Sequence, residues 1–315
     1  MTNEIKIFYS KDWKDYELLD TGDREKLEHV GPYTFVRPSE SEVWSKTLDK
    51  KEWGNIDGKF WSSKVGAKPG WQLNSEISHG LFERKQKDLK WEMGYNGMKF
   101  IASPTPFRHL GFFPEQASHW DFIEGKIKNA GRPIKFLNLF GYTGLASLFA
   151  LRGGAEVTHV DASKQSLAWA KENQNLNNEL VNSPMRIIED DVMKFLAREE
   201  KRGNKYDAVI MDPPKFGRGP KGETWKIEEM LPALLTQVKK VLSDDPLFVI
   251  LTSYSTDASA LTLGYALEEM MKPARNAFSI ADAGGGNIET GELCVLEKSQ
   301  NRLISLAHTA VWQKP

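Results

Sequence analysis

Residues 134–161 read IKFLNLFGYTGLASLFALRGGAEVTHVD, and this stretch decides the fold. A short apolar run at 136–140 is followed by the turn 141–144, a helix-like segment at 145–151 and a second apolar run at 157–160. The order strand, glycine turn, helix, strand is typical of a parallel α/β sheet, in which ligands bind at the carboxyl ends of the strands. We therefore expect a binding crevice beside the turn.

The residues of this unit point to a cofactor that contains a nucleoside. The glycines of the turn allow a ligand to approach the backbone, and the following helix offers free N–H groups. Asp161 ends the second run, where its carboxylate can accept hydrogen bonds from both ribose hydroxyls. The turn reads GYTG and lacks the middle glycine of a dinucleotide fingerprint, so it favours S-adenosylmethionine over NAD. An ordinary βαβ unit with a structural glycine turn is the alternative.

The composition limits the classes of protein to which the chain can belong. The 315 residues include 40% hydrophobic and 27% charged residues, which is normal for a soluble globular chain. The formal net charge of −1 gives no global signal for nucleic acid, and the single cysteine excludes an internal disulfide. The sequence shows neither a signal peptide nor an apolar run of membrane-spanning length. We expect a cytoplasmic protein without a membrane segment.

Residues 1–105 are expected to form a β-rich N-terminal module that could recognise the substrate. Short strand-like runs alternate there with turn signals, and Asn96-Gly97 lies between two alternating runs, as in a hairpin. The region holds six of the ten tryptophans, and these either stack on nucleic-acid bases or fill the core of the module. We favour core packing for most of them.

Residues 106–315 are expected to form a doubly wound, Rossmann-like domain. Pro114-Glu115 suits a helix start, and a helix should follow over 117–128. From residue 134 onward strands and helices alternate, which predicts a parallel sheet with helices on both faces. The later predicted elements are strands at 186–188, 207–211, 246–252, 292–297 and 305–312, helices at 164–178, 193–202, 225–242 and 258–271, and a basic glycine loop at 217–221.

Acidic residues follow three consecutive strands of this predicted sheet. Asp161 suits the ribose, and Asp191 or its neighbour Asp190 could accept a hydrogen bond from the adenine amino group. Asp212 follows the next strand. The carboxyl ends of parallel strands meet at one edge of a sheet, so we expect these side chains to converge there.

The sharpest motif is Asp212-Pro213-Pro214-Lys215. Two prolines stiffen the backbone and end the strand ladder. The Asp212 carboxylate and the Pro213 carbonyl could then accept both hydrogens of an amine and aim its lone pair at a methyl donor. Lys215 could contact phosphate or steer an anionic substrate. The alternative is a strand-ending aspartate with a proline-stiffened loop. His109 and His119 have no companion ligands nearby in the sequence, so no metal is predicted.

The segments N138LFGYTG144, V160D161, E189DD191 and D212PPKF216 resemble class I S-adenosylmethionine-dependent methyltransferases, which have a seven-stranded sheet. More narrowly, they resemble the bacterial large-subunit ribosomal RNA methyltransferases. In G111FFPEQ116, Phe113 and Gln116 match a cofactor-lining pattern of that family, whereas Ala117 stands where the family has arginine. The resemblance implies cofactor contacts from Phe113, Gln116, Asn138, Phe140, Gly141, Tyr142, Thr143, Gly144, Asp161, Ala162, Ser163, Asp190, Asp191, Val192 and Asp212.

The resemblance also implies RNA, in particular ribosomal RNA, as the substrate. Methylation of cytosine carbon 5 requires a cysteine nucleophile, which in such relatives follows the fifth strand. Here that position reads Thr252-Ser253-Tyr254, and the sole cysteine, Cys294, lies in an apolar run. We therefore predict methylation of a base nitrogen by direct transfer. The alternatives are methylation of a protein or small amine, and an RNA-binding protein without catalytic activity.

Overall fold

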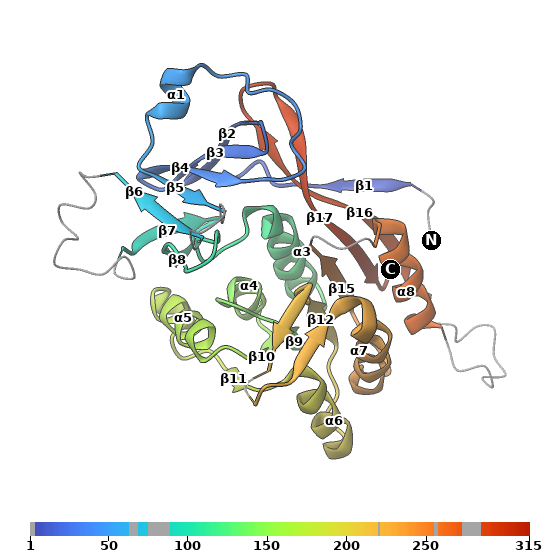
Figure 1. The fold of residues 1–315 in the computed structure, drawn as a ribbon. Helices are drawn as coiled ribbons and strands as arrows, with labels where there is room; N and C mark the ends of the chain where they lie inside the picture. Colours follow the sequence, from blue (N-terminus) through green and yellow to red (C-terminus); the bar gives the residue numbers. More distant parts are fainter. Residues whose placement is uncertain (1–3, 63–68, 75–88, 220, 255–257, 273–284) are drawn as a thin grey trace. The chain divides into compact units, whose positions relative to one another are not determined.

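The computed structural model describes residues 4–62, 69–74, 89–219, 221–254, 258–272 and 285–315. The chain forms two compact units (Figure 1). The first comprises Met1–Phe8, Ser118–Leu293 and Ser305–Pro315, and the second comprises Tyr9–Ala117 and Cys294–Ile304. Both units are therefore built from separate stretches of sequence. The division into a β-rich N-terminal module of residues 1–105 and a methyltransferase domain of residues 106–315 stays a proposal.

Among the described residues, strands of the first unit lie side by side in the order β11-β10-β9-β12-β15-β17-β16 (Figure 1). The strands from β11 to β15 run parallel, and β17 is antiparallel to β15. This arrangement confirms the predicted doubly wound α/β fold, but the sheet among the described residues has 13 strands and not seven, because β16 also pairs with β1 and β2. The strands are β9 (Lys135–Leu139), β10 (Glu156–Asp161), β11 (Met185–Glu189), β12 (Ala208–Met211), β15 (Phe248–Ser253), β16 (Asn287–Glu297) and β17 (Arg302–Gln313), with β1 (Ile5–Phe8) parallel to β16.

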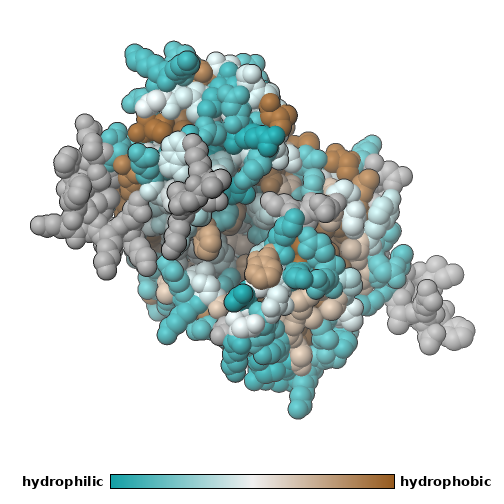
Figure 2. Space-filling model, viewed as in Figure 1, coloured by the Kyte–Doolittle hydropathy of each residue, from teal (hydrophilic) through white to brown (hydrophobic). Residues whose placement is uncertain are grey.

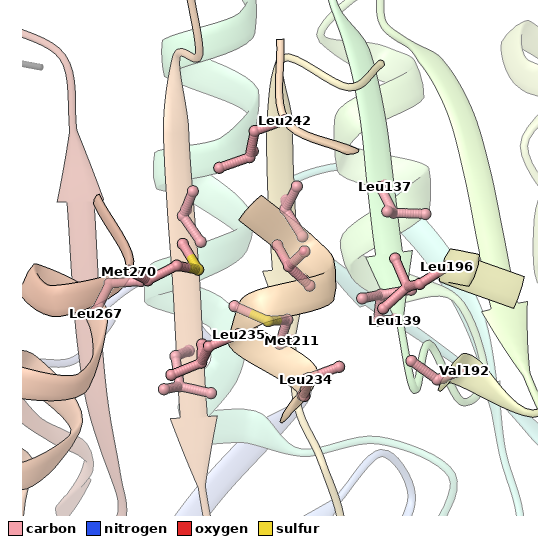
Figure 3. Packing of buried hydrophobic residues seen from close by; sticks show 14 of the residues in the cluster. Leu137, Leu139, Val192, Leu196, Met211, Leu234, Leu235, Leu242, Leu267 and Met270 are labelled. Carbon is pink, nitrogen blue, oxygen red and sulfur yellow. The ribbon is translucent and has the colours of Figure 1, made fainter. Parts of the chain in front are cut away.

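Three helices cover one face of this sheet. They are α6 (Val192–Arg202), α7 (Ile227–Val241) and α8 (Ala260–Met271). Alternate strand residues such as Leu137, Leu139 and Met211 point toward leucines and methionines of the helices (Figure 3). Because α6 is apolar only on its inner side, its outer side adds hydrophilic residues to the surface at the lower part of Figure 2. Burial of these side chains, at about 25 cal/mol per Å², is the main force holding the layers together.

The opposite face carries α3 (Ala117–Lys128), α4 (Leu145–Arg152) and α5 (Lys164–Asn175). Phe122 of α3 meets Phe248 of β15 edge-on, with ring centroids 5.3 Å apart. Trp120 stacks on Phe149 of α4 at 5.5 Å. The helix predicted at 117–128 is confirmed, and η2 (Pro114–Gln116) precedes it. No helix among the described residues is long and apolar enough to cross a membrane.

The second unit is rich in β-structure, as predicted. Asn96 and Gly97, with φ of 46° and 80°, form the predicted turn of a hairpin. Trp71 and Trp91 are buried against Phe35, whereas Trp61 is 39% exposed. Core packing therefore accounts for Trp71 and Trp91. The elements are β2 (Tyr16–Gly22), β3 (Glu25–Val30), β4 (Tyr33–Pro38), β5 (Gly58–Trp61), β6 (Gly70–Leu73), β7 (Trp91–Tyr95), β8 (Met98–Ala102) and the short helix α1 (Lys50–Gly54).

The prediction for residues 217–226 was wrong. Instead of a loop followed by a helix from Trp225, the chain forms a hairpin of β13 (Phe216–Arg218) and β14 (Thr224–Lys226), and α7 begins at Ile227. The buried Trp225 indole donates a hydrogen bond to the Pro214 carbonyl at 2.7 Å, which ties the second strand to the proline motif. No local sequence pattern indicates this bond between Trp225 and Pro214.

Candidate cofactor site and active site

The turn after β9 is held in a left-handed backbone conformation. Phe140, Tyr142 and Gly144 have φ of 60°, 51° and 87°. The Gly141 N–H donates to the Val160 carbonyl at 3.0 Å, and the Gly144 N–H donates to the Gly141 carbonyl at 3.0 Å. Positive φ costs a non-glycine residue about 1–3 kcal/mol, and such strain is often found at functional sites. Here the fixed turn keeps its N–H groups at the carboxyl edge of the sheet.

A buried polar network lies directly beneath this turn. The Asn138 amide donates to Ser147 Oγ at 3.0 Å, and Ser147 Oγ lies 3.0 Å from His159 Nδ1. A β-carbon on Gly141 would overlap the His159 ring, so only glycine fits above it. Burial lowers the pKa of His159 to about 4, while a hydrogen bond to the Tyr142 backbone raises it in part. A neutral imidazole therefore supports the turn.

Asp161 meets the turn from the end of β10. Its carboxylate accepts hydrogen bonds from the Tyr142 N–H at 2.9 Å and the Ser163 N–H at 2.8 Å. Burial raises the pKa of Asp161, although the backbone N–H groups of Ser163, Tyr142 and Ala162 lower it. A carboxylate has about four lone-pair sites, so besides the three backbone N–H groups it can still accept a hydrogen bond from a ribose hydroxyl. This donor set fits the nucleoside part of S-adenosylmethionine.

The two acidic residues after β11, Asp190 and Asp191, already interact with other groups of the protein. Asp190 forms an ion pair with Arg198 of α6, and its N–H donates to the Asp161 carbonyl at 3.1 Å. Asp191 caps α6 by accepting a hydrogen bond from the Lys194 N–H at 3.0 Å. The first residue of the helix, Val192, is buried. A contact of any of these residues with adenine stays a proposal.

Asp212 lies at the carboxyl end of β12, between the ends of β9 and β15. Met211 is paired with Leu139 on one side and Leu251 on the other, and the Asp212 N–H donates to the Leu139 carbonyl at 3.4 Å. Asp212 is half-buried, Pro213 is buried and Lys215 is exposed. A half-buried carboxylate therefore lies at the carboxyl edge of the sheet, with an exposed cation three residues later in the chain.

The sheet therefore brings most predicted site residues of the first unit to one edge. The ends of β11, β10, β9 and β12 lie side by side in that order. Phe113 and Gln116 belong to the second unit, where the Gln116 N–H donates to the Phe113 carbonyl at 3.1 Å and Gln116 is buried. Their cofactor contacts stay proposals. The residues at the edge are Asn138, Phe140, Gly141, Tyr142, Thr143, Gly144, Asp161, Ala162, Ser163, Asp190, Asp191, Val192, Asp212 and Pro213.

Sequence reasoning missed His159 and Ser147 as supports of the turn. One signal was available, because His159 interrupts an apolar run and is paired in register with Asn138, which interrupts another. The described residues contain no group of three or more His, Cys, Asp or Glu side chains placed to hold a metal ion. Cys294 is buried in β16.

Comparisons with known proteins agree with this fold. Residues 85–256 match the family model of S-adenosylmethionine-dependent methyltransferases. The crystal structure of an S-adenosylmethionine-dependent methyltransferase from Agrobacterium tumefaciens is 37% identical, with a TM-score of 0.86, and the match covers 98% of this chain and 94% of that one.

Two curated relatives are named as ribosomal RNA methyltransferases. Large subunit methyltransferase K/L of Alteromonas mediterranea is 31% identical over 187 residues, which cover 58% of this chain and 26% of that protein. Large subunit methyltransferase K of Neisseria meningitidis serogroup B is 29% identical over 230 residues, covering 71% and 61%. The matched part thus spans about a quarter of the K/L protein. On the family model and the Agrobacterium structure, the chain belongs to the S-adenosylmethionine-dependent methyltransferase family.

Proposed function

We propose that this methyltransferase transfers a methyl group to a base nitrogen of RNA, in particular ribosomal RNA. The observation that carries the proposal is the position of Asp212-Pro213 at the strand end next to the glycine turn. The names of the two relatives support RNA as the acceptor. When bound, S-adenosylmethionine supplies an electrophilic methyl group.

The acceptor would be held by the chain's own oxygen atoms. The Asp212 carboxylate and the Pro213 carbonyl accept the two hydrogens of an exocyclic amine, which leaves the nitrogen lone pair directed at the methyl group. Holding the amine in this orientation beside the methyl group makes the transfer effectively unimolecular. Once the nitrogen carries the methyl group it must lose one proton, and the Asp212 carboxylate is placed to accept it. Because Thr252, Ser253 and Tyr254 replace a cysteine at the end of β15, nucleophilic addition to cytosine is disfavoured.

The test is methylation of RNA and protein fractions from cells that lack the gene, with a tritiated methyl donor and the purified enzyme. Label on a guanine or adenine nitrogen after digestion to nucleosides supports the proposal. Label on cytosine carbon 5 would contradict it, and label confined to protein would favour a protein or amine acceptor. Asp212→Ala should abolish turnover while affinity for adenosylhomocysteine is largely kept. A protein that only binds RNA would show no turnover even before substitution.

A further inference from the structure

The hairpin that follows the proline motif has two different faces. Phe216 pairs with Lys226, Gly217 with Trp225 and Arg218 with Thr224. In an antiparallel pair, directly opposed side chains lie on the same face. One face thus carries Phe216, Arg218, Thr224 and Lys226, all exposed, and the other carries the buried Trp225. Phe216 is 55% exposed, which is unusual for an aromatic ring fixed in a strand.

Trp225, on the inner face, attaches this hairpin to the proposed active site. The Trp225 ring packs on Phe140 of the cofactor turn with centroids 4.9 Å apart, and its indole N–H donates to the Pro214 carbonyl at 2.7 Å. The Ile227 N–H donates to the Lys215 carbonyl at 3.2 Å. These bonds tether both strands close to Asp212. The outward direction of Phe216 is therefore fixed by the fold.

Positive charge surrounds the exposed ring. Lys215 precedes Phe216 and Arg218 follows on the same face, and within the described residues neither side chain forms an ion pair or hydrogen bond. Lys226, opposite Phe216, contacts Glu229 at 2.8 Å in an exposed ion pair of the kind that contributes little. An aromatic ring among cations is the combination that binds single-stranded nucleic acid, because bases stack on the ring and phosphates meet the cations.

We propose that Phe216 is a stacking site for an unpaired nucleobase beside the one that is methylated. Asp212 is half-buried and must receive the reacting base, whereas Phe216 lies four residues further on, exposed, on the outer face of the hairpin. The ring therefore contacts a neighbouring nucleotide, and Arg218 and Lys215 contact its phosphates. This inference rests on the proposed function and adds the requirement for a flanking unpaired nucleotide.

The first experiment compares Phe216→Ala with the wild-type enzyme on the mapped RNA substrate. Loss of one stacked base should raise KM for RNA roughly ten- to a hundredfold. The turnover at saturating RNA and the affinity for adenosylhomocysteine should stay unchanged, and Phe216→Tyr should restore KM. Tyr265→Ala is the matched control, because Tyr265 on α8 is equally exposed at 55%.

The second experiment removes the base from the RNA instead of the ring from the protein. An abasic site is placed at each of the two nucleotides that flank the methylated nucleotide. At one of them it should raise KM for the wild-type enzyme as much as Phe216→Ala does. Combined with Phe216→Ala, it should have no further effect. Independent, additive losses would overturn the stacking proposal, as would a KM for Phe216→Ala equal to that of Tyr265→Ala. If the wild-type enzyme methylated no RNA, the proposed function itself would fail.

Discussion

At the level of single residues, Gly141 lies where the turn of residues 140–144 meets the His159 ring that supports it. A β-carbon there would overlap the His159 ring and lie 3.1 Å from Asn138 Cγ. We expect Gly141→Ala to displace the turn and weaken adenosylhomocysteine binding at least tenfold, or about 1.4 kcal/mol, by isothermal titration calorimetry.

Gly125→Ala is the control for the added methyl group. Gly125 lies in α3, where a β-carbon would meet nothing within 4 Å. This substitution should leave the affinity for adenosylhomocysteine unchanged, and it should stabilise the helix by a fraction of a kcal/mol. Equal affinities for the two variants would show that the turn tolerates a side chain.

Two buried histidines of the first unit predict how stability depends on pH. Burial lowers the pKa of His119 to about 3 and that of His159 to about 4, against about 6.5 in the unfolded chain. The unfolded state therefore binds more protons, and stability is complete above pH 6.5 and falls as pH decreases toward the folded pKa values. Each histidine should lower the free energy of unfolding by roughly 2 kcal/mol when the pH falls from 7 to 5.

Urea unfolding of wild type and His119→Phe at pH 7 and pH 5 checks this expectation. The variant lacks one group that takes up a proton on unfolding, so its stability should change less between the two pH values. Thr309, which bonds His119 at 2.9 Å, retains its hydrogen bond to the Leu251 carbonyl at 3.1 Å. A pH dependence equal to that of the wild type would contradict the burial argument.

At the level of elements, Trp225 connects the hairpin of β13 and β14 to the proline motif and thereby helps to fix the position of that motif. Trp225→Phe keeps a ring against Phe140 but removes the hydrogen bond to the Pro214 carbonyl. We expect turnover in the methylation assay to fall several-fold, because small displacements of positioning groups have large effects on rate. Affinity for adenosylhomocysteine should change less than twofold.

The corresponding control is Trp120→Phe. Trp120 is buried in the same unit and stacks on Phe149, so a smaller ring there should lower thermal stability and leave turnover unchanged. A loss of turnover as large as that of Trp225→Phe would mean that destabilisation alone accounts for the effect.

Elements with a regular local pattern could be predicted from the sequence, and elements defined by distant partners could not. The run at 136–140, the capping Ser163 and the left-handed Gly203 at the end of α6 gave β9, α5 and α6 within a few residues. In contrast, the glycines of residues 217–221 suggested a loop, because no local pattern shows that Trp225 forms a hydrogen bond with Pro214. The candidate site shows the same division. Asp161 and Asp212 could be proposed as site residues because they follow predicted strands, whereas the position of His159 beneath the turn depends on the register of β9 and β10.

At the level of the whole molecule, the two units share one interleaved chain. Residues 294–304 complete the second unit, where the Lys298 and Ser299 N–H groups donate to the carbonyls of Leu18 and Leu19, and Glu297 accepts from Thr21. β1 adds to the first unit by pairing with β16. Local sequence patterns contain no information about such exchanges, so the boundary at 105 and 106 could be proposed only from composition.

We therefore expect a fragment of residues 1–117 not to unfold cooperatively on its own. Its Asp20 would lose the Ser299 hydroxyl, which donates at 2.7 Å, and β2 would lose its partner in β16. Co-expression with residues 118–315 should restore a cooperative thermal transition, measured by circular dichroism. A sharp transition for the fragment alone would show that its own strands suffice.

The interleaving also has a consequence for synthesis on the ribosome. Since β17 lies between β15 and β16, and residues 294–304 close the second unit, neither unit has all of its parts until the last strands emerge from the exit tunnel. Until then the nascent chain exposes unpaired strand edges, which are prone to misassociation. Both units should accordingly complete their folding only after β16 and β17 have left the exit tunnel, and dependence on chaperones should be greatest while these two strands are still being synthesised.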